Sequence, residues 1–447
     1  MLQIQSHRLS YNPHLWLIAG FAFTILSGAV LLALPIASST EPIPFIDALF
    51  TATSAVCVTG LNTLMIGTEF SFFGQLIILC LIQIGGLGFM TFAVFLTTLF
   101  GKKLSWKQRL VMKESTKTSS YEGLGTLALQ ILWISFLFEG LSTLLLTIHW
   151  SPRLGWVDGF YYALFHSVSA FNNAGFSLWN DSLSQFVGDA TVNIAITSLI
   201  ILGGIGFPVI MDLYKKKSWR TLMLHSKIVL VTTTILIIIG WFFLLLNEYE
   251  NPDTMGSLNT HERFWAAFFQ SVTARTAGFN TIPIEALQAT SLSLLILLMF
   301  IGASSGGTGG GIKTNTFVVL FFAVRSFIKG EEEINLFERR INWRYVVTAL
   351  AVFAVSIAVI ILATSILLWS EQIASEHFLS LLFEVTSAFG TVGLSTGITA
   401  NLTSIGKLIM ILVMFTGRLG PLTLAFAFTQ RSTPAKLRFP EENMLIG

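Results

Sequence analysis

The 447-residue sequence has little charge: only 11% of its residues are Asp, Glu, Lys or Arg, whereas soluble domains carry about 25%. With 53% hydrophobic residues, the chain cannot cover its surface with polar groups in water. This composition argues against a soluble protein and predicts an integral membrane protein. The two cysteines, Cys57 and Cys80, are too few for a disulfide framework. The histidines lack metal-ligand spacing, so neither a resident metal nor a cofactor is predicted.

Phosphate-binding and hydrolase signatures are also missing. Residues 306–314 resemble a phosphate-binding loop, but Ile312 separates Gly311 from Lys313 and no strand precedes the segment. Residues 393–397 match a nucleophile elbow in letters only, because they follow a helical stretch rather than a strand. No nucleophile and base converge, so an intramembrane enzyme is the least favoured functional class.

Eight apolar stretches are long enough to cross a bilayer, which takes roughly 20 helical residues. They cover about 14–35, 72–100, 126–149, 191–213, 227–247, 289–326, 344–369 and 406–430. The polar residues 1–11 precede the first stretch, and no small-residue cleavage site closes it. That stretch is therefore expected to be a retained span rather than a signal peptide.

Lysine and arginine recur after every second span, in segments 101–117, 214–227 and 325–344, and acidic residues prevail in the loops between. Basic residues concentrate on the cytoplasmic side of membrane proteins. The sequence therefore predicts a multi-pass protein whose two termini and three basic segments are cytoplasmic.

A fourfold repeat underlies this pattern. Between each odd span and the next even span lies a shorter apolar stretch that ends in small residues and is followed by a glycine. These glycines are Gly60, Gly175, Gly278 and Gly393, spaced by 115, 103 and 115 residues (175 − 60, 278 − 175, 393 − 278). Glycine motifs at 84–88, 202–206, 301–302 and 416–420 add a second match. Four tandem repeats are therefore predicted: 1–117, 118–222, 223–338 with a glycine-rich intramembrane loop, and 339–447 with a C-terminal tail.

Each short stretch is about three helical turns long, so it must enter the membrane and return on the same side. The predicted fold is an all-α membrane protein: four M1–pore loop–M2 repeats, with eight transmembrane helices and four re-entrant pore helices, around one pseudo-fourfold ion pathway. Unpaired carbonyls at this depth must be buried or line a water-filled path. Helix C-termini aimed at the axis favour a cation.

The loops after the four stretches are predicted to form a potassium filter of backbone carbonyls. A single glycine among 36 is more often a close-packing site in a membrane helix, but four in the same phase of a repeat favour a filter. The predicted filter residues are Val58, Thr59, Gly60, Asn173, Ala174, Gly175, Thr276, Ala277, Gly278, Thr391, Val392 and Gly393.

Four motifs in these loops, at 57–61, 171–176, 275–280 and 388–394, resemble the Trk, Ktr and HKT superfamily of potassium transporters, most closely its Ktr-type membrane subunits. The similarity runs from Asn12 to the last residues. In that family each repeat supplies one filter glycine, and relatives with serine in the first loop tend to favour sodium, so Gly60 points to potassium.

The resemblance implies potassium uptake across a bacterial plasma membrane by a homodimer with one pore per subunit. It also implies a cytosolic ring of nucleotide-binding regulatory subunits. Family members are often stimulated by sodium, which makes sodium a candidate activator. Nucleic acid is not expected as a partner.

The sixth span contains six glycines within residues 302–311. Each costs a helix about 1 kcal/mol relative to alanine, so the span should break around a loop that only the protein interior can hold. In the resembled family this loop is mobile and obstructs the pore. The predicted gate comprises Gly302, Ser304, Ser305, Gly306, Gly307, Thr308, Gly309, Gly310, Gly311, Lys313 and Arg418. Arg418 is expected to line the pore as an electrostatic barrier; a structural clamp on loop carbonyls is the alternative.

Three further expectations concern charged residues. Arg275 and Glu384 lie at filter depth and are expected to pair, unless Glu384 meets backbone amides instead. The clusters at 102–109 and 215–217, and a mixed helix-like stretch at 331–344, offer docking surfaces for the cytosolic ring. The runner-up function is a secondary cation symporter with a midplane site, which would show inverted repeats and acids within spans.

Overall fold

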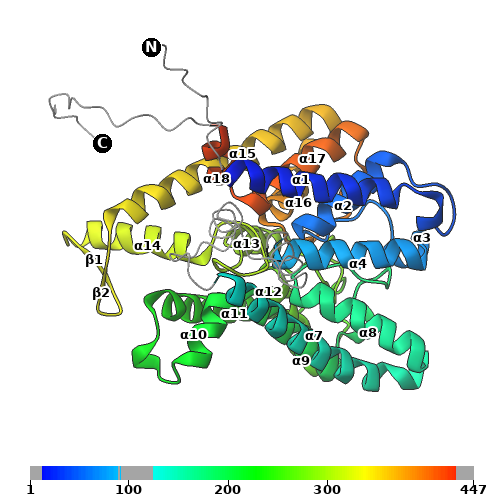
Figure 1. Ribbon diagram of the computed structural model, residues 1–447, viewed down its shortest axis with the longest axis horizontal. Coiled ribbons are helices and arrows are strands. Elements are labelled where there is room, and N and C mark those ends of the chain that lie inside the picture. Colours follow the sequence, from blue (N-terminus) through cyan, green and yellow to red (C-terminus); the bar gives the residue numbers. More distant parts are fainter. Residues whose placement is uncertain (1–12, 89–90, 92–123, 429–447) are drawn as a thin grey trace, which may run out of the picture.

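The computed structural model describes residues 13–88, 91 and 124–428, and this part of the chain is mostly helical (Figure 1). The basic segment 101–117, most of 88–100 and both chain ends lie outside the described residues. The α-helices are α1 (Pro13–Leu32), α2 (Phe45–Cys57), α3 (Ile66–Glu69), α4 (Phe72–Leu87), α7 (Leu124–Leu154), α8 (Trp156–Phe171), α9 (Ala190–Ile205), α10 (Phe207–Lys215), α11 (Leu224–Glu248), α12 (Thr260–Thr273), α13 (Ala289–Phe300), α14 (Thr314–Ile328), α15 (Trp343–Glu371), α16 (Phe378–Gly390), α17 (Ser404–Leu419) and α18 (Pro421–Phe428). Short 3-10 turns lie at Pro35–Ala37, Ser184–Phe186, Trp219–Thr221, Ser375–His377 and Thr399–Asn401.

Four helices of the described chain are long and apolar enough to cross a membrane: His14–Leu32, Ala128–Leu154, Leu224–Glu248 and Trp343–Glu371. They coincide with the first, third, fifth and seventh predicted spans. Their outer faces expose large apolar side chains, including Trp133, Leu246 and Trp369, which are 76%, 78% and 83% exposed. Apolar surface of this extent is stable against lipid rather than water.

Three of the even-numbered spans, the fourth, sixth and eighth, are broken in the described part of the chain. The predicted break in 289–326 is confirmed, because α13 ends at Phe300 and α14 begins at Thr314. The expectation of continuous helices over 191–213 and 406–430 is wrong. Gly206, with φ of 92°, separates α9 from α10 at a bend of 92°, and Gly420, with φ of 84°, separates α17 from α18. Glycine ends a helix in this left-handed conformation without a Cβ penalty, and hydropathy alone does not register it.

Four short helices, α2, α8, α12 and α16, each pack against the long helix that precedes them. The helix that follows each short helix also packs against the next short helix along the chain: α4 on α8, α9 on α12, and α13 on α16. The last such helix, α17, packs against α2, the first short helix, and so closes the cycle of contacts. The short helices are therefore neighbours in a closed cycle.

A buried ion pair joins the two ends of this cycle. Lys407 Nζ of α17 lies 2.5 Å from Asp47 Oδ1 in the first turn of α2. The two side chains are only 15% and 9% exposed, so water screens their attraction little. Asp47 also lies near the N-terminus of α2, where the helix dipole favours a negative charge.

Residues 331–342 are not helical, contrary to the expectation for 331–344; only the last two residues of that stretch belong to a helix, α15. Strand β1 (Ile334–Leu336) pairs antiparallel with β2 (Arg339–Ile341), with Ile334 opposite Ile341. Phe337 and Glu338 both have positive φ, of 49° and 61°, as a two-residue type I′ hairpin turn requires. Ile334 and Ile341 are buried together with Val346. The alternation of apolar and polar side chains along the strands therefore determined the secondary structure here, rather than the helix-like spacing of the charges.

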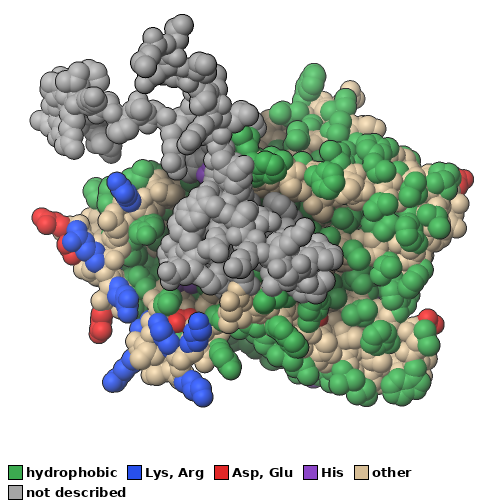
Figure 2. Space-filling view, in the orientation of Figure 1, with side chains coloured by type: hydrophobic (Ala, Val, Ile, Leu, Met, Phe, Trp, Pro, Cys, Tyr) green, Lys and Arg blue, Asp and Glu red, His purple; other side chains and the backbone are tan. Residues whose placement is uncertain are grey.

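The described basic segments lie at one end of the molecule. In Figure 2, Lys and Arg side chains gather over the α10–α11 connection and the hairpin, while the visible opposite end carries acidic and apolar side chains. Segments 214–227 and 325–344 therefore share one side, as alternate spanning predicts.

Replacing Lys407 with alanine should destabilise the protein, because Asp47 would lose its cation in a poorly hydrated site. The expected loss is about 1–3 kcal/mol of unfolding free energy, between the values for exposed and buried pairs. Unfolding of the detergent-purified protein measures it. Lys216→Ala is the control, since Lys216 is 37% exposed and 3.3 Å from Asp212. Equal losses in the two variants would contradict a special role for the Lys407–Asp47 pair.

Candidate functional site

The four segments after the short helices share one unusual backbone conformation. The residue two positions before each glycine has positive φ: Val58 58°, Asn173 58°, Thr276 76° and Thr391 50°. The glycines follow with φ of 88°, 70°, 81° and 93° at Gly60, Gly175, Gly278 and Gly393. Positive φ is a rare outlier for β-branched residues such as valine and threonine. It costs about 1–3 kcal/mol per residue and concentrates at functional sites.

The same four glycines meet in cyclic order. A Cβ added to Gly60 would lie 2.5 Å from the carbonyl oxygen of Ala174, and one on Gly175 would lie 2.6 Å from that of Ala277. On Gly278 it would collide with the oxygen of Val392, and on Gly393 with that of Thr59. Each loop thus presents the carbonyl before its glycine to the glycine of a neighbouring loop, and the fourth loop returns to the first. The structure brings the four predicted triplets together.

Hydroxyl groups of the short helices hold the loops. Ser54 Oγ accepts a hydrogen bond from Gly60 N at 3.0 Å, and Ser387 Oγ accepts one from Gly393 N at the same distance. In the third loop, Thr273 Oγ1 donates to the Phe279 carbonyl at 2.7 Å. These bonds fix strained backbone in the first, third and fourth repeats.

A second equivalent position lies farther back on each short helix, at Thr51, His166, Gln270 and Glu384, all of them buried. Glu384 accepts hydrogen bonds from Ser395 Oγ (2.6 Å), Thr396 N (2.8 Å) and Thr399 Oγ1 (2.6 Å). His166 Nε2 lies 3.0 Å from Ser177 Oγ. Ser177 and Ser395 each follow the loop glycine by two residues, so repeats two and four anchor the outer part of the loop in the same way.

The predicted pair of Arg275 with Glu384 is wrong. Arg275 Nη2 donates to the Gly302 carbonyl at 3.1 Å, whereas Glu384 is satisfied by donors 11 to 15 residues downstream. The alternative of a bond to a backbone amide is confirmed for Thr396. The hydroxyls of nearby residues hydrogen-bond Glu384, so it needs no cationic partner. A search for residues of opposite charge does not find such hydroxyls.

The glycine-rich segment 301–313 docks on the break between α9 and α10. Ser304 N and Thr308 N donate to the carbonyls of Gly204 (3.0 Å) and Gly203 (3.1 Å). Its far side packs directly against the loops: a Cβ on Gly309 would collide with the Thr276 side chain, and one on Gly310 with that of Thr391. Lys313 Nζ bonds the Gly309 carbonyl at 2.6 Å and so braces the segment from α14.

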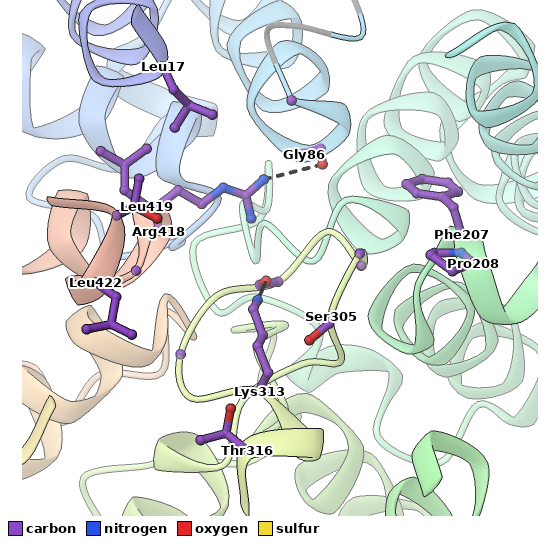
Figure 3. Close-up of a pocket in the computed structure, with 18 of the residues that line it drawn as sticks. Leu17, Gly86, Phe207, Pro208, Ser305, Lys313, Thr316, Arg418, Leu419 and Leu422 are labelled. Carbon is purple, nitrogen blue, oxygen red and sulfur yellow. Dashed lines mark hydrogen bonds between the residues drawn. The ribbon is translucent and has the colours of Figure 1, made fainter. Parts of the chain in front are cut away.

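Arg418 reaches this segment from α17. Its guanidinium donates to the carbonyl of Thr308 and to those of Gly85 and Gly86 at the end of α4. The clamp expected as the alternative role is therefore present. Arg418 also borders a cavity of about 410 Å³ together with Lys313 and the glycine-rich segment. Figure 3 shows Arg418 bonded to Gly86 and Lys313 reaching toward the glycine-rich segment.

The glycine ring separates two cavities. The one with Arg418 lies on the side of the glycine-rich segment. A second, of about 340 Å³, is bordered by Gly60, Gly175, Gly278 and Gly393. It also contains Glu69 and Glu285, whose negative charge attracts cations. A path between the two cavities would pass the ring and then the glycine-rich segment.

A polar cluster near the second loop was missed. Glu139 in α7 is 3% exposed and is bonded by Gln83 of α4 and by Asn172, the residue before Asn173. An acidic residue in the middle of a predicted span is itself a functional signal. The predicted site residues nevertheless did not include Glu139, because they were chosen from the glycine pattern.

A family model matches residues 17–435: TrkH, described as a cation transport protein. The chain belongs to the TrkH family. It is a multi-pass membrane protein and a transport protein rather than an enzyme, and the resemblance seen in its loop motifs is confirmed.

The relatives span almost the whole chain. It is 44% identical over 437 residues to the Ktr system potassium uptake protein B of Bacillus subtilis, covering 98% of this chain and 97% of the relative. Identity to the potassium/sodium uptake protein NtpJ of Enterococcus hirae is 38%, covering 98% of each. The structure matches that of the potassium transporter TrkH from Vibrio parahaemolyticus with a TM-score of 0.74 at 19% identity, covering 95% of this chain and 86% of that one. This last likeness establishes a TrkH-like fold.

Glu384→Ala should lower the free energy of unfolding by about 2–4 kcal/mol, because three donors, the buried Thr399 hydroxyl among them, would lose their shared acceptor. Denaturation of the purified protein in detergent measures the loss. Glu376→Ala is the control, since Glu376 is an exposed acid just before the same helix and should change stability by less than about 0.5 kcal/mol. A loss at Glu384 no larger than in the control would show that the hydroxyl cluster does not depend on the carboxylate.

Proposed function

We propose that this chain is the ion-conducting subunit of a potassium uptake system, with a backbone-carbonyl filter formed by four M1–pore loop–M2 repeats and eight spans. The observation that carries the proposal is the cyclic approach of Gly60, Gly175, Gly278 and Gly393 to the carbonyls of neighbouring loops. The names of relatives, which include potassium uptake, support the choice of ion.

In this proposal the filter replaces water with peptide oxygens. The oxygens of Thr59, Ala174, Ala277 and Val392 would substitute for the hydration shell of a potassium ion. The four short helices end just before these loops, and the negative ends of their dipoles favour a cation there. Glycine leaves the ring free of side chains and permits positive φ without strain.

The gate would be the glycine-rich segment together with Arg418. Gly309 and Gly310 pack against two of the four loops, so a cation leaving the ring would meet them next. Residues 304–311 carry no apolar side chain and are held by hydrogen bonds. A stretch without apolar anchorage of its own is a low-stability element that is able to move. In the closed position Arg418 would add its positive charge to the obstruction.

Orientation and partners follow from the charge distribution and the relatives. The end that carries segments 214–227 and 325–344 would face the cytoplasm, with both termini on that side. One relative is named protein B of a Ktr system, and this name describes it as one component of a larger system. A homodimer that binds a cytosolic nucleotide-binding ring at these basic surfaces is therefore proposed, with sodium as an activator.

A secondary cation symporter remains the second candidate, because Glu139 is a buried acid within a span, as such transporters use. Accumulation of potassium in proteoliposomes against its own gradient, driven by sodium, would favour it. Passive flux that follows the potassium gradient alone favours the channel-like subunit.

Gly60→Ser should reduce discrimination against sodium, since its Cβ would meet the Ala174 carbonyl and displace one quarter of the ring. Rubidium or potassium flux into proteoliposomes, with sodium as competitor, gives the ratio and tests the proposed function in the wild type. Gly155→Ser is the control: Gly155 has a similar φ of 83° with open space around it. An unchanged ratio in well-folded Gly60→Ser would remove the first loop from the filter.

Deleting residues 306–310 should raise flux several-fold, because the segment that packs against the loops is removed. Gly309→Ala should act in the same direction, since its Cβ would collide with Thr276. The initial rate of rubidium uptake into proteoliposomes measures the flux of both variants. Flux that falls in both, while the protein stays monodisperse and keeps its potassium preference, would show that the segment supports the pathway and does not obstruct it.

A further inference from the structure

Glu139 is a carboxylate buried in the middle of α7. Gln83 Nε2 donates to both of its oxygens at 3.1 Å, and Asn172 Nδ2 donates to Oε1 at 3.2 Å. Among the described residues, no Lys, Arg or His forms an ion pair with Glu139. Burying a charge in this way in a membrane span costs free energy. Residues that carry such a charge are therefore functional candidates.

The hydrogen-bond geometry indicates the ionised form. In the described part of the chain, the side chains that bond the carboxylate do so through an amide NH₂, which donates. The acceptor oxygen of Gln83 already receives Asn172 Nδ2 at 2.8 Å. Amide donors reach both carboxylate oxygens, and hydrogen bonds of this kind favour the anion.

The cluster lies directly behind the ion pathway. Asn172 follows α8 and immediately precedes Asn173, the strained residue of the second loop. Its side chain touches Gly86, where a Cβ would collide with it, and Arg418 donates to the carbonyl of the same Gly86. Asn173 in turn donates to Thr276 Oγ1 of the third loop at 3.1 Å. One residue therefore separates the amide that binds Glu139 from the carbonyl ring.

We propose that Glu139 tunes the cation affinity of the pathway: its negative charge behind the second loop raises the affinity of the pathway for its cation and offsets the nearby positive charge of Arg418. In a dry protein interior this charge acts on the ring with little screening. The inference rests on the proposed potassium function, because it assigns a role within that pathway.

The test is the potassium concentration at half-maximal uptake. Glu139→Gln keeps the side-chain size and removes the charge, so this concentration should rise on the order of tenfold, the effect of a unit charge at an effective dielectric constant of about 20. The maximal rate should change far less. Glu139→Asp retains the charge and should stay near the wild-type value. Glu248→Gln is the control, since Glu248 is another fully buried, hydrogen-bonded acid, at the outer end of α11.

Gln83→Lys provides a second route if Glu139→Gln fails to fold. It leaves Glu139 in place but puts a cation against the carboxylate, and should also raise the half-saturating concentration. Unchanged half-saturation in Glu139→Gln or Gln83→Lys would overturn the proposal. So would a rise in Glu139→Asp as large as in Glu139→Gln, since shape rather than charge would then matter. A wild-type protein that fails to transport potassium would instead refute the proposed function, which separates the two failures.

Discussion

Every irregular stretch of backbone in a bilayer must find its hydrogen bonds inside the protein, and this constraint organises the structure. The four loops carry residues at positive φ and carbonyls that no helix satisfies, so they can exist only where packed helices enclose them. The cycle of α2, α8, α12 and α16 with the helices that follow them supplies this enclosure. The serine hydroxyls of Ser54 and Ser387, the carboxylate of Glu384 and the guanidinium of Arg418 then satisfy the groups that remain.

Spacing carried most of what could be predicted from the sequence. Four glycines in one phase of a repeat located the loops, and the glycine-rich run located the break in the sixth span. Both patterns can be seen within a single sequence, without an alignment to relatives. The bends at Gly206 and Gly420 were missed because both lie in continuous apolar sequence, and hydropathy does not record backbone φ. The hairpin at 334–341 was missed because its charges concealed an alternation of only a few residues.

Side-chain partners were predicted least well, because they depend on which helices meet. Arg275 and Glu384 lie in adjacent repeats, yet Arg275 donates to a backbone carbonyl, whereas Glu384 accepts from hydroxyls and a backbone amide. Arg418 was expected as a pore charge, with a clamp on loop carbonyls as the alternative, and its contacts with Thr308 and Gly85 establish the clamp. Only tertiary geometry could connect Glu139 with Gln83 and Asn172, whose sequence separations from it are 56 and 33 residues.

The pair of Asp47 with Lys407 joins positions 360 residues apart, and this has a consequence for biosynthesis. The first short helix is made long before the lysine that neutralises its acid. Until α17 is inserted, Asp47 has no cation from this partner and the cycle of short helices is open on one side. The last quarter of the chain therefore determines when the ring can close, and translation that stops before Lys407 would leave a strained, partly hydrated set of loops for quality control to recognise.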